Sequence, residues 1–377
     1  MIMSTYLAGM GWVTPLGAGL DEVWARLMAG DTAEVKTIAN PETGRGLAYA
    51  PVPMKLVEAL GRNPRLRRAS AISYFAVAAG LAALENAGIT MTPELAAQTA
   101  VVFAISSGGV AYTRRFYEQL VKQGANAASP LLFPETVYNA PASHFAAQLG
   151  IDGASYTLVG DSSVGLAAMK FAEQLLDTGD LAQVVVVGSE EMDWVLCEAY
   201  RDWRLARGGD AGSRGALLAE GAAAVVLARE GRTKIAALHD GVSVFRRRDA
   251  GRALDRVFAD LMGKCAVDAV IGCANGTFAD RAESAAIAHH CPKAAAYFPQ
   301  RVFGEALGAS ALMQVIVGAL ALAKGGLPGG EERGATLKTA LISALGFNQQ
   351  ASGLVLARRQ VGSGGSLGPN PPAGTSG

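Results

Sequence analysis

The stretch Ser155–Asp177, SYTLVGDSSVGLAAMKFAEQLLD, contains a predicted strand, a sharp turn and a predicted helix. Its first apolar run, Tyr156–Val159, predicts a buried β-strand. Gly160 marks the turn, and the helix is expected to begin at Ser162 or Ser163. Apolar residues recur around the whole helix, which indicates a mostly buried helix rather than a surface one. These residues are Val164, Leu166, Met169, Phe171, Leu175 and Leu176.

Asp161 occupies the turn itself, between the strand and the start of the helix. Backbone N–H groups and the helix dipole stabilise negative charge at such a position. In many enzymes the same position holds a nucleophile, because the local field lowers the pKa of a thiol. Two interpretations of Asp161 follow. It is either a helix cap that accepts the Ser163 or Val164 amide, or a catalytic carboxylate.

The composition describes a large globular chain of balanced charge. Its 377 residues are half hydrophobic, with 33 basic and 33 acidic side chains. Such a chain can bury a large core, as one two-halved unit or as two domains. A net charge near zero argues against a nucleic-acid or anionic-membrane surface, and we interpret the basic run at 246–248 as a solvated loop. No apolar run approaches the roughly 18 residues of a membrane span, and no signal peptide is expected.

The cysteines and histidines do not predict a metal site or disulfides. Cys197, Cys265, Cys273 and Cys291 are scattered without ligand or disulfide spacing, which suits a reducing cytoplasm. The run His289-His290-Cys291 is a weak metal signal, because adjacent residues rarely ligate one ion together. We therefore expect no metal and no cofactor, and a cytoplasmic location.

Strands and helices alternate along the chain, which predicts an α/β protein with layered mixed sheets. A turn is expected at residues 11–17, where glycines and a proline follow the first strand. Strands are predicted at 5–9, 99–104, 181–188, 221–228, 234–238 and 269–272, and helices at 21–28, 69–87, 112–123 and 252–262.

Several motifs resemble the β-ketoacyl synthases of fatty-acid and polyketide assembly. The run Val159-Gly160-Asp161-Ser162-Ser163 lies over the family's T-A-C-S-S turn, with Asp161 in place of the nucleophilic cysteine. The family opening, G-x-G-x-V-T-P-L-G and then W-x-x-L-x-x-G, is matched from Gly9 to Gly30. Residues 129–148 match S-P-x-x-x-P-x-x-x-x-N-x-x-A-x-H. We interpret the histidine of this segment, His144, as a structural core residue with a backbone partner.

The resemblance covers about residues 5–357 and implies the thiolase fold, which is αβαβα in section. It implies two duplicated halves with mixed five-stranded sheets, at residues 1–231 and 232–361. Residues 362–377, GSGGSLGPNPPAGTSG, form a low-complexity tail that cannot pack a core.

Every position that carries chemistry in the family is changed here. Ketosynthases use a cysteine, two histidines and a lysine to decarboxylate malonyl thioesters and stabilise the enolate. The first family histidine lies in the motif N-A-H-G-T. Matching its Gly-Thr to Gly276-Thr277 puts Asn275 at the histidine position, whereas matching the acids that follow it puts Cys273 there. The other replacements are Gln300 for the lysine, Glu305 for the second histidine and Gln314 for a later glutamate.

These changes remove the family's condensation chemistry. Asp161 is a poor acyl acceptor, and no imidazole remains to polarise a thioester. An Asp161–Glu305 pair would place two like charges in one pocket, which raises a pKa rather than builds an oxyanion site.

Degenerate chains of this kind resemble the chain-length factors of type II polyketide and aryl polyene systems. The resemblance implies a heterodimer with an active β-ketoacyl synthase, which supplies the cysteine, and work with an acyl carrier protein. The inactive subunit would help to shape the acyl-chain tunnel. The candidate tunnel residues are Tyr112, Phe116, Leu132, Phe133, Tyr138 and Phe347, although each could equally be an ordinary core residue. Asn348 and Gln349 replace flexible glycines beside Phe347, which argues against a mobile gate.

Two other functions remain open. The chain could be an acyltransferase or a decarboxylase that acts through Asp161 or Ser162, with Asp161 standing in for the glutamine of decarboxylating ketosynthases. Those enzymes retain their histidines, however, and a serine nucleophile needs a base within reach. The chain could also be a homodimeric scaffold that binds an acyl chain or a carrier protein.

Overall fold

Two five-stranded sheets form the framework of the computed structural model, which describes residues 4–208, 214–329 and 337–359. The first contains β1 (Tyr6–Thr14), β5 (Thr99–Ile105), β6 (Ser155–Val159), β7 (Gln183–Glu190) and β9 (Gly221–Ala228). The second contains β10 (Thr233–Leu238), β12 (Ala269–Ile271), β13 (Ala295–Tyr297), β14 (Thr339–Leu345) and β15 (Gln350–Arg358).

The two sheets have the same strand order. The first runs β6-β5-β7-β9-β1 and the second β13-β12-β14-β15-β10, so each has its third strand at one edge and its first strand at the other. The two first strands pair antiparallel through Tyr6–Lys234 and Leu7–Thr233, which joins the sheets. This repeated order is the internal duplication expected from the sequence. We propose that the halves divide in the loop 229–232, near the predicted boundary, while the predicted tail lies outside the described residues.

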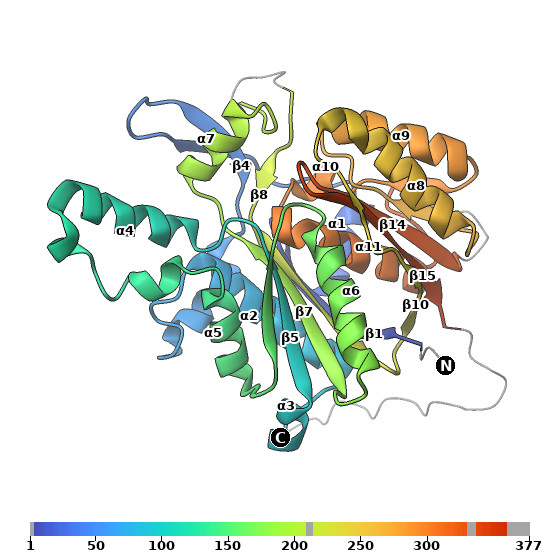
Figure 1. The fold of residues 1–377 in the computed structure, drawn as a ribbon, viewed down its shortest axis with the longest axis horizontal. Helices are drawn as coiled ribbons and strands as arrows, with labels where there is room; N and C mark the ends of the chain where they lie inside the picture. Colours follow the sequence, from blue (N-terminus) through green and yellow to red (C-terminus); the bar gives the residue numbers. More distant parts are fainter. Residues whose placement is uncertain (1–3, 209–213, 330–336, 360–377) are drawn as a thin grey trace.

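Helices form three layers around the sheets (Figure 1). α6 (Val164–Asp177) and α11 (Ser310–Lys324) pack on each other and on both sheets, forming the central layer. α2 (Ala71–Ala87) and α5 (Ala140–Leu149) cover the first half, and α8 (Ala250–Met262) and α9 (Phe278–His290) cover the second. The result is the αβαβα arrangement of the thiolase fold.

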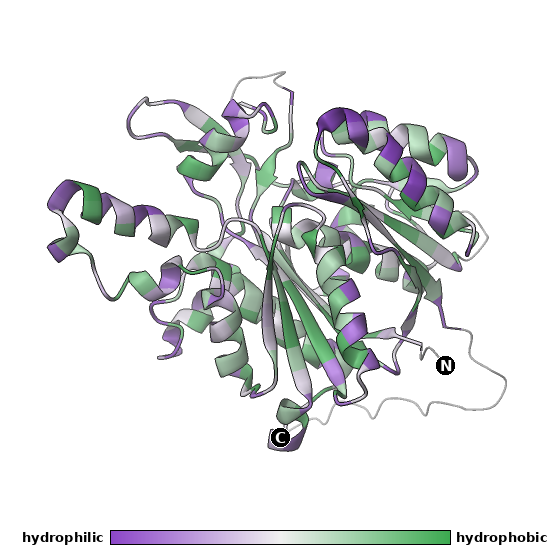
Figure 2. Ribbon diagram, in the orientation of Figure 1, coloured by the Kyte–Doolittle hydropathy of each residue, from purple (hydrophilic) through white to green (hydrophobic). Residues whose placement is uncertain are grey.

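The central helix α11 corrects the expectation about apolar runs. Leu307–Lys324 is an 18-residue segment with a mean hydropathy of 1.7, which is long and apolar enough to cross a membrane. Within the fold, however, 89% of that segment is buried. Figure 2 shows the hydrophobic colour concentrated along the strands that the central helices cover. Burial against two sheets explains the composition of this helix without a bilayer.

The remaining described elements surround this framework. A small separate sheet contains β3 (Lys36–Ala39), β4 (Gly46–Ala50) and β8 (Leu218–Ala219). The other helices are α1 (Leu20–Met28), α3 (Pro93–Ala97), α4 (Val110–Gln123), α7 (Trp194–Asp202) and α10 (Gln300–Phe303). Short strands β2 (Gly17–Ala18) and β11 (Val242–Ser243) pair with β1 and β15.

Three predictions in the first half are wrong. β1 continues to Thr14, through the first part of the expected turn. Its glycines admit α2, because a Cβ on Gly9 would lie 2.3 Å from the Ala83 carbonyl oxygen. β6 is not buried but lies at the edge of the sheet, with Tyr156 and Val159 exposed. The following helix begins at Val164, one or two residues later than expected.

Candidate functional site

Glu305 lies at the centre of a closed hydrogen-bond network between the two halves. It follows α10 and is only 1% exposed. Its Oε1 accepts hydrogen bonds from Ser162 Oγ at 2.9 Å, Ser310 Oγ at 2.5 Å and the Leu307 N–H at 3.1 Å. Its Oε2 accepts from Asn275 Nδ2 at 2.7 Å. Desolvation raises the pKa of this carboxyl group. Four donors bond to this carboxyl group, so its role in the fold is structural.

Asp161 is adjacent in sequence but faces a different environment. Its Oδ2 accepts from the Asn348 N–H at 3.0 Å, and its own N–H donates to Gln349 Oε1 at 3.1 Å. Burial raises the pKa of Asp161. Its carboxylate therefore ties the turn to the loop before β15. Ser163 occupies the N-cap position of α6, and the Asp161 carboxyl group accepts hydrogen bonds from the Ser163 N–H and, at 3.4 Å, from Ser163 Oγ, so Asp161 also holds the start of the helix.

The structure separates the two acids that were expected to share a pocket. Asp161 lines a hollow of about 560 Å³, whereas Glu305 does not line it and is enclosed by its own donors. Phe347 lines the same hollow and stacks edge-on with Tyr200 and Phe278, at ring distances of 5.9 and 6.4 Å. The two bonds between Asp161 and residues 348–349 hold the loop that carries this phenylalanine.

The other predicted replacements lie outside the network. Gln314 of α11 donates to the carbonyl oxygens of Ile271 and Ser343, which ties the central helix to β12 and β14. Gln300 is buried in α10, and its Oε1 has no hydrogen-bond partner among the described residues. Cys273 is buried with its N–H on Glu283, and burial raises the pKa of its thiol well above the usual value. Asn275, not Cys273, is thus the residue that contacts Glu305.

The candidate tunnel residues lie on an arm formed by α4 and the segment before α5, which we call the α4 arm (residues 110–138). It projects from the body of the molecule (Figure 1). Phe133 is 55% exposed and Tyr138 is 47% exposed, so they are not core residues. Tyr112, Phe116 and Leu132 are half-buried. Of the six candidates, only Phe347 lines the Asp161 hollow, and tunnel lining by the others stays a prediction.

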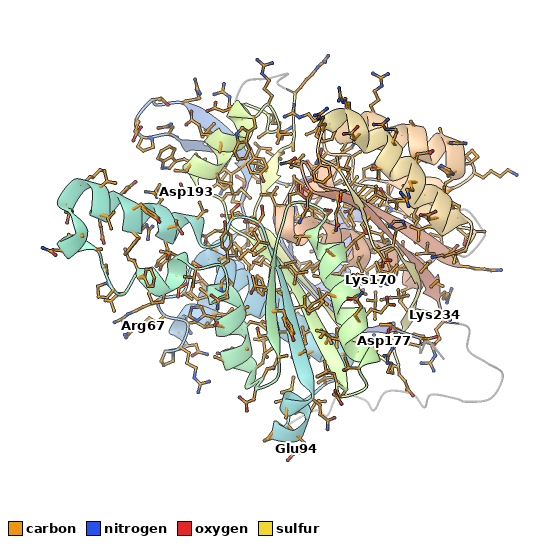
Figure 3. All side chains as sticks on the ribbon, viewed as in Figure 1. Arg67, Glu94, Lys170, Asp177, Asp193 and Lys234 are labelled. Carbon is orange, nitrogen blue, oxygen red and sulfur yellow. The ribbon has the colours of Figure 1, made fainter. Side chains whose placement is uncertain are left out.

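One ion pair attaches the α4 arm to the body. Arg114 Nε lies 3.0 Å from both carboxylate oxygens of Asp193, which caps α7. Figure 3 labels the position of Asp193. Arg114 also pairs with Glu118 of its own helix at 2.8 Å. The base of the arm is therefore fixed to the core, while its apolar outer residues remain exposed.

The comparison with known families decides the assignment. A family model described as "Beta-ketoacyl synthase, N-terminal domain" matches residues 6–232, more than half of the chain. The chain belongs to the β-ketoacyl synthase family.

Relatives by sequence are distant. A 3-oxoacyl-[acyl-carrier-protein] synthase 2 of Vibrio cholerae is 24% identical over 186 residues, 49% of this chain and 45% of that protein. A putative polyketide β-ketoacyl synthase 2 of Streptomyces cyaneus is 25% identical and covers 84% of this chain and 83% of the relative. The chain thus spans less than half the length of the Vibrio cholerae relative that it matches.

Solved structures of the family share the fold. The ishigamide ketosynthase/chain length factor has a TM-score of 0.82 at 19% identity and covers 96% of this chain and 100% of its own. A ketosynthase in complex with its chain length factor from Xenorhabdus doucetiae has a TM-score of 0.73 at 15% identity, covering 95% and 98%.

His144, which lies in the segment that matches the family pattern at residues 129–148, has a side-chain partner. His144 Nε2 lies 2.6 Å from Glu135 Oε1, so the expected backbone partner was wrong. Glu135 also accepts the Ser70 N–H at 3.1 Å. This ketosynthase-like chain therefore uses His144 to fasten α5 to the segment before α2, away from Asp161.

A set of buried carboxylates escaped the sequence analysis. Glu190 accepts the N–H groups of Ser106 and Ser107 at 3.0 and 2.8 Å, and desolvation raises its pKa to about 8. Glu191 and Glu220 likewise each accept two backbone N–H groups, with pKa values raised by desolvation to about 7 and about 6. In sequence these glutamates resemble solvated acids, and only their proximity to buried strands hints at burial.

Two C-terminal histidines of α9 meet one acid of α8. His289 Nδ1 and His290 Nε2 lie 3.1 and 2.7 Å from Asp255 Oδ1. These hydrogen bonds are the first cause of the lowered pKa of Asp255. The ligand atoms of the three residues lie within 4.8 Å of one another, and Cys291 instead contacts Met262. We interpret the group as a clip between the two outer helices, and the expectation of no metal is untested.

Proposed function

We propose that this chain is a non-catalytic, chain-length-factor-like subunit that pairs with an active β-ketoacyl synthase. The observation that carries the proposal is the closed Glu305 network. Asn275 and Glu305 occupy the positions of the two family histidines, and Ser162 follows the nucleophile position. These three residues bond to one another and leave no free acid, base or nucleophile among them. A condensing enzyme needs such groups open to its substrate.

The thiols of the described residues support the same conclusion. Cys197 and Cys273 are buried, and burial raises the pKa of Cys197 to about 12. A thiol in this state supplies almost no thiolate at neutral pH. The acyl chain would therefore be carried by the partner's cysteine, and an acyl carrier protein would deliver extender units to that partner. We assign the complex to the cytoplasm.

An exposed apolar surface supports the existence of a protein partner. The α4 arm exposes seven large hydrophobic side chains, and edge strand β6 exposes two more. α5 contacts both the arm and β6, so it connects the two exposed groups. Soluble monomers rarely expose so much contiguous apolar surface. Its members are Tyr117, Leu120, Val121, Leu131, Phe133, Val137, Tyr138, Tyr156 and Val159.

The backbone of β6 offers the partner a sheet edge. The Ala154 carbonyl and the Gly160 N–H bond to β5, and hydrogen-bonding direction alternates with a period of two residues. Residues 155, 157 and 159 therefore direct their backbone groups toward the open edge. An unpaired edge of this kind is a template for pairing with another chain. Two of the similar solved structures contain a ketosynthase together with a chain length factor, as their titles state.

One contact favours a second candidate, an enzyme with a serine nucleophile. Ser162 Oγ donates to Glu305 Oε1, and a carboxylate with a raised pKa can act as a general base. Against this, Ser162 is 4% exposed and neither residue lines the Asp161 hollow. Asp161 borders the hollow and remains the candidate for any decarboxylase activity.

The experiment is co-expression with the candidate ketosynthase from the same genomic neighbourhood, with the tag on this chain. We expect a stable complex of one copy of each chain by light scattering. A chain that purifies as a stable homodimer and does not bind the ketosynthase would contradict the proposal and favour the scaffold function. Thioester hydrolysis by this chain alone that disappears in Ser162→Ala would favour the enzyme.

A further inference from the structure

Two histidines and one acid converge on a single point between the outer helices of the second half. Asp255 lies on α8, and His289 and His290 end α9, which packs beside it (Figure 1). His289 Nδ1 and His290 Nε2 lie 3.1 and 2.7 Å from the same oxygen, Asp255 Oδ1. All three ligand atoms lie within 4.8 Å of one another. We call this group the α8–α9 cluster.

The other histidines of the chain are placed differently. The sequence contains four histidines, and each of the remaining two faces one acid without a second imidazole. His144 lies 2.6 Å from Glu135, and His239 lies 3.1 Å from Asp260. Among the residues that the structure describes, three potential metal ligands come together only at the α8–α9 cluster. The convergence is therefore a property of this place in the fold and not of the histidines in general.

The two histidines converge although they are neighbours in the sequence. Successive side chains on a helix point about 100° apart, so adjacent residues rarely share an ion. This pair uses different nitrogens: His289 presents Nδ1, which is close to the backbone, whereas His290 presents the distal Nε2. The rings lie side by side, with their centroids 4.3 Å apart. The different reach of the two nitrogens thus compensates for the different directions of the side chains.

Buried neighbours hold the inner side of the cluster in place. Leu254 and Phe258, which flank Asp255 on α8, are fully buried, and the His290 ring lies 6.3 Å from the Phe258 ring. The His290 side chain is 15% exposed, whereas those of Asp255 and His289 are 53% and 71% exposed. The cluster is therefore anchored toward the core and open to solvent on its outer side, where an ion can enter and water can complete the coordination.

The electrostatic surroundings of the cluster favour a cation. Both histidines lie in the last turn of the 13-residue α9, where the helix dipole stabilises positive charge. The arginines nearest to Asp255 on α8 are engaged by other acids. Arg252 pairs with Asp249 at 2.6 Å, and Arg256 lies 4.0 Å from Asp260. The Asp255 carboxylate is therefore left to the two imidazoles, and the three side chains offer two nitrogens and one negative oxygen to an ion.

We propose that the α8–α9 cluster binds a zinc ion, with His289 Nδ1, His290 Nε2 and an Asp255 oxygen as its protein ligands. Imidazole nitrogen suits zinc, whereas magnesium and calcium prefer oxygen alone. A tetrahedral ion with bonds of about 2.0–2.1 Å separates its ligands by about 3.3 Å. The nitrogen–oxygen separations of 3.1 and 2.7 Å are slightly shorter, so rotation of the exposed Asp255 and His289 side chains admits the ion.

The bound ion joins α8 to α9 and stabilises the outer layer of the second half, because the unfolded chain does not bring the acid to the histidines. The inference goes beyond the proposed pairing with a ketosynthase and does not depend on it, since all three ligands belong to this chain.

Calorimetry tests the proposal on the full chain, without a polyhistidine tag and after treatment with EDTA, with Zn²⁺ and Mg²⁺ as probes. We expect one Zn²⁺ per chain with a micromolar Kd, and no binding of Mg²⁺. About a hundredfold excess over Kd should raise the melting temperature by about 3 °C, because the ion favours the folded chain. No Zn²⁺ binding at high micromolar concentrations would overturn the proposal, and so would binding that leaves the melting temperature unchanged.

Substitution of the exposed ligands locates the ion. His289→Gln should weaken Zn²⁺ binding at least tenfold and leave the fold intact, because this side chain is 71% exposed. Asp255→Asn should also weaken binding, since it removes the negative charge. His239→Gln is the matched control, because His239 meets a single acid, and it should bind Zn²⁺ as the wild type does. Circular dichroism confirms that each variant folds. Unchanged binding in both ligand variants would place the ion elsewhere, on a thiol such as the half-buried Cys265, and overturn the proposal.

Discussion

At the scale of single residues, Glu305 has a structural role at the position where the family has a catalytic histidine. Its carboxyl group joins Ser162 of the first half to Asn275 and Ser310 of the second. A histidine could not accept these several donors at once, because a neutral imidazole offers one acceptor nitrogen. The substitution predicted from the sequence therefore has a physical role in the fold.

Removing Glu305 should destabilise the chain. Glu305→Ala leaves buried donors without an acceptor, and each costs about 1–3 kcal/mol. We expect a total loss of about 3 kcal/mol or more in the free energy of unfolding. Glu305→Gln should lose less, because it keeps one acceptor oxygen. Urea unfolding measures both against Glu42→Ala, which changes an exposed glutamate. A Glu305→Ala variant as stable as that control would mean that the network does not stabilise the fold.

Glu190 predicts a pH dependence of stability. Burial raises its pKa from the ordinary value of 4.5 to about 8, so the folded state binds this proton more tightly than the unfolded chain. The stabilisation is complete below about pH 4.5 and is lost as the pH rises through 8. Glu190→Gln removes the titration. The melting temperature of the wild type relative to Glu190→Gln should therefore fall between pH 5 and 9. A constant difference would show that Glu190 does not titrate in this range.

The residue changes could be predicted from the sequence, but their contacts could not. The family pattern identified Asp161, Asn275 and Glu305, because each lies in a recognisable motif. Ser310 has no motif, and its bond to Glu305 depends on the turn before α11. The sequence could not show that the Asp161 side chain turns toward the Asn348 amide while Glu305 lies in its own network.

At the scale of elements, edge strand β6 was predicted to be buried and is exposed in the structure. Its composition, SYTLV, is that of a buried strand, and it is nevertheless exposed. Apolar residues on an open edge indicate a surface that another chain covers. In β1 the reverse happened: glycines that suggested a turn lie within the strand, because α2 packs too closely for any side chain.

A proline at the open edge tests this reading of β6. Thr157 directs its backbone N–H away from β5, so Thr157→Pro removes an outward donor and no bond of the sheet itself. We expect it to abolish co-purification of the ketosynthase while the melting temperature changes little. Thr157→Val, which retains the N–H group, is the control and should still bind. Retained binding in a folded Thr157→Pro variant would remove β6 from the interface.

The α4 arm makes a separate prediction about the isolated chain. Val121 is 79% exposed and Phe133 is 55% exposed, so both should drive self-association in the absence of a partner. Val121→Lys/Phe133→Lys should shift the isolated chain toward monomer in sedimentation velocity and also weaken ketosynthase binding. If the wild-type chain is already a monodisperse monomer without its partner, the α4 arm does not drive self-association and this prediction is wrong.

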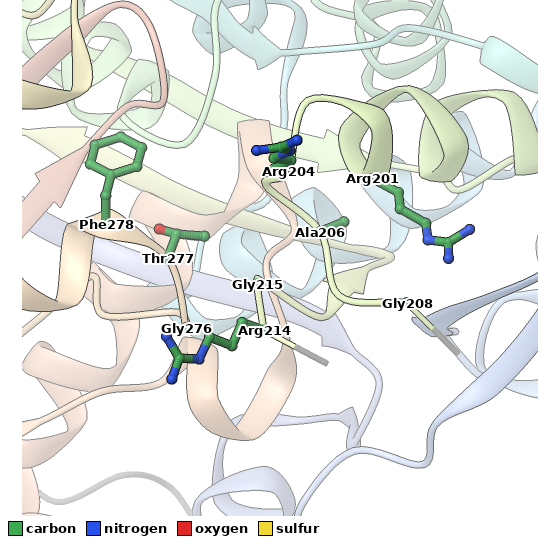
Figure 4. Close-up of a pocket in the computed structure, with 9 residues that line it drawn as sticks. All are labelled: Arg201, Arg204, Ala206, Gly208, Arg214, Gly215, Gly276, Thr277 and Phe278. Carbon is green, nitrogen blue, oxygen red and sulfur yellow. The ribbon is translucent and has the colours of Figure 1, made fainter. Parts of the chain in front are cut away.

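At the scale of the whole molecule, each duplicated half contributes part of the region that matches the family's active site. The first half contributes Asp161 and Ser162, and the second contributes Asn275 and Glu305. The alternation of strands and helices predicted a duplication around layered mixed sheets, and the resemblance to β-ketoacyl synthases supplied the thiolase fold. The hollow between residues 201–208, 214–215 and 276–278 (Figure 4) could not be predicted that way, since segments far apart in the sequence must meet to form it.

The central claim is that the complex condenses acyl chains with the partner's cysteine and none of this chain's groups. The most direct measurement is condensation with malonyl carrier protein by the purified complex, comparing three forms. We predict full loss when the ketosynthase cysteine is replaced, and retained turnover in Asp161→Ala and in Ser162→Ala of this chain. Turnover that survives loss of the partner's cysteine, and disappears with Asp161 or Ser162, would contradict the account and make this subunit the enzyme.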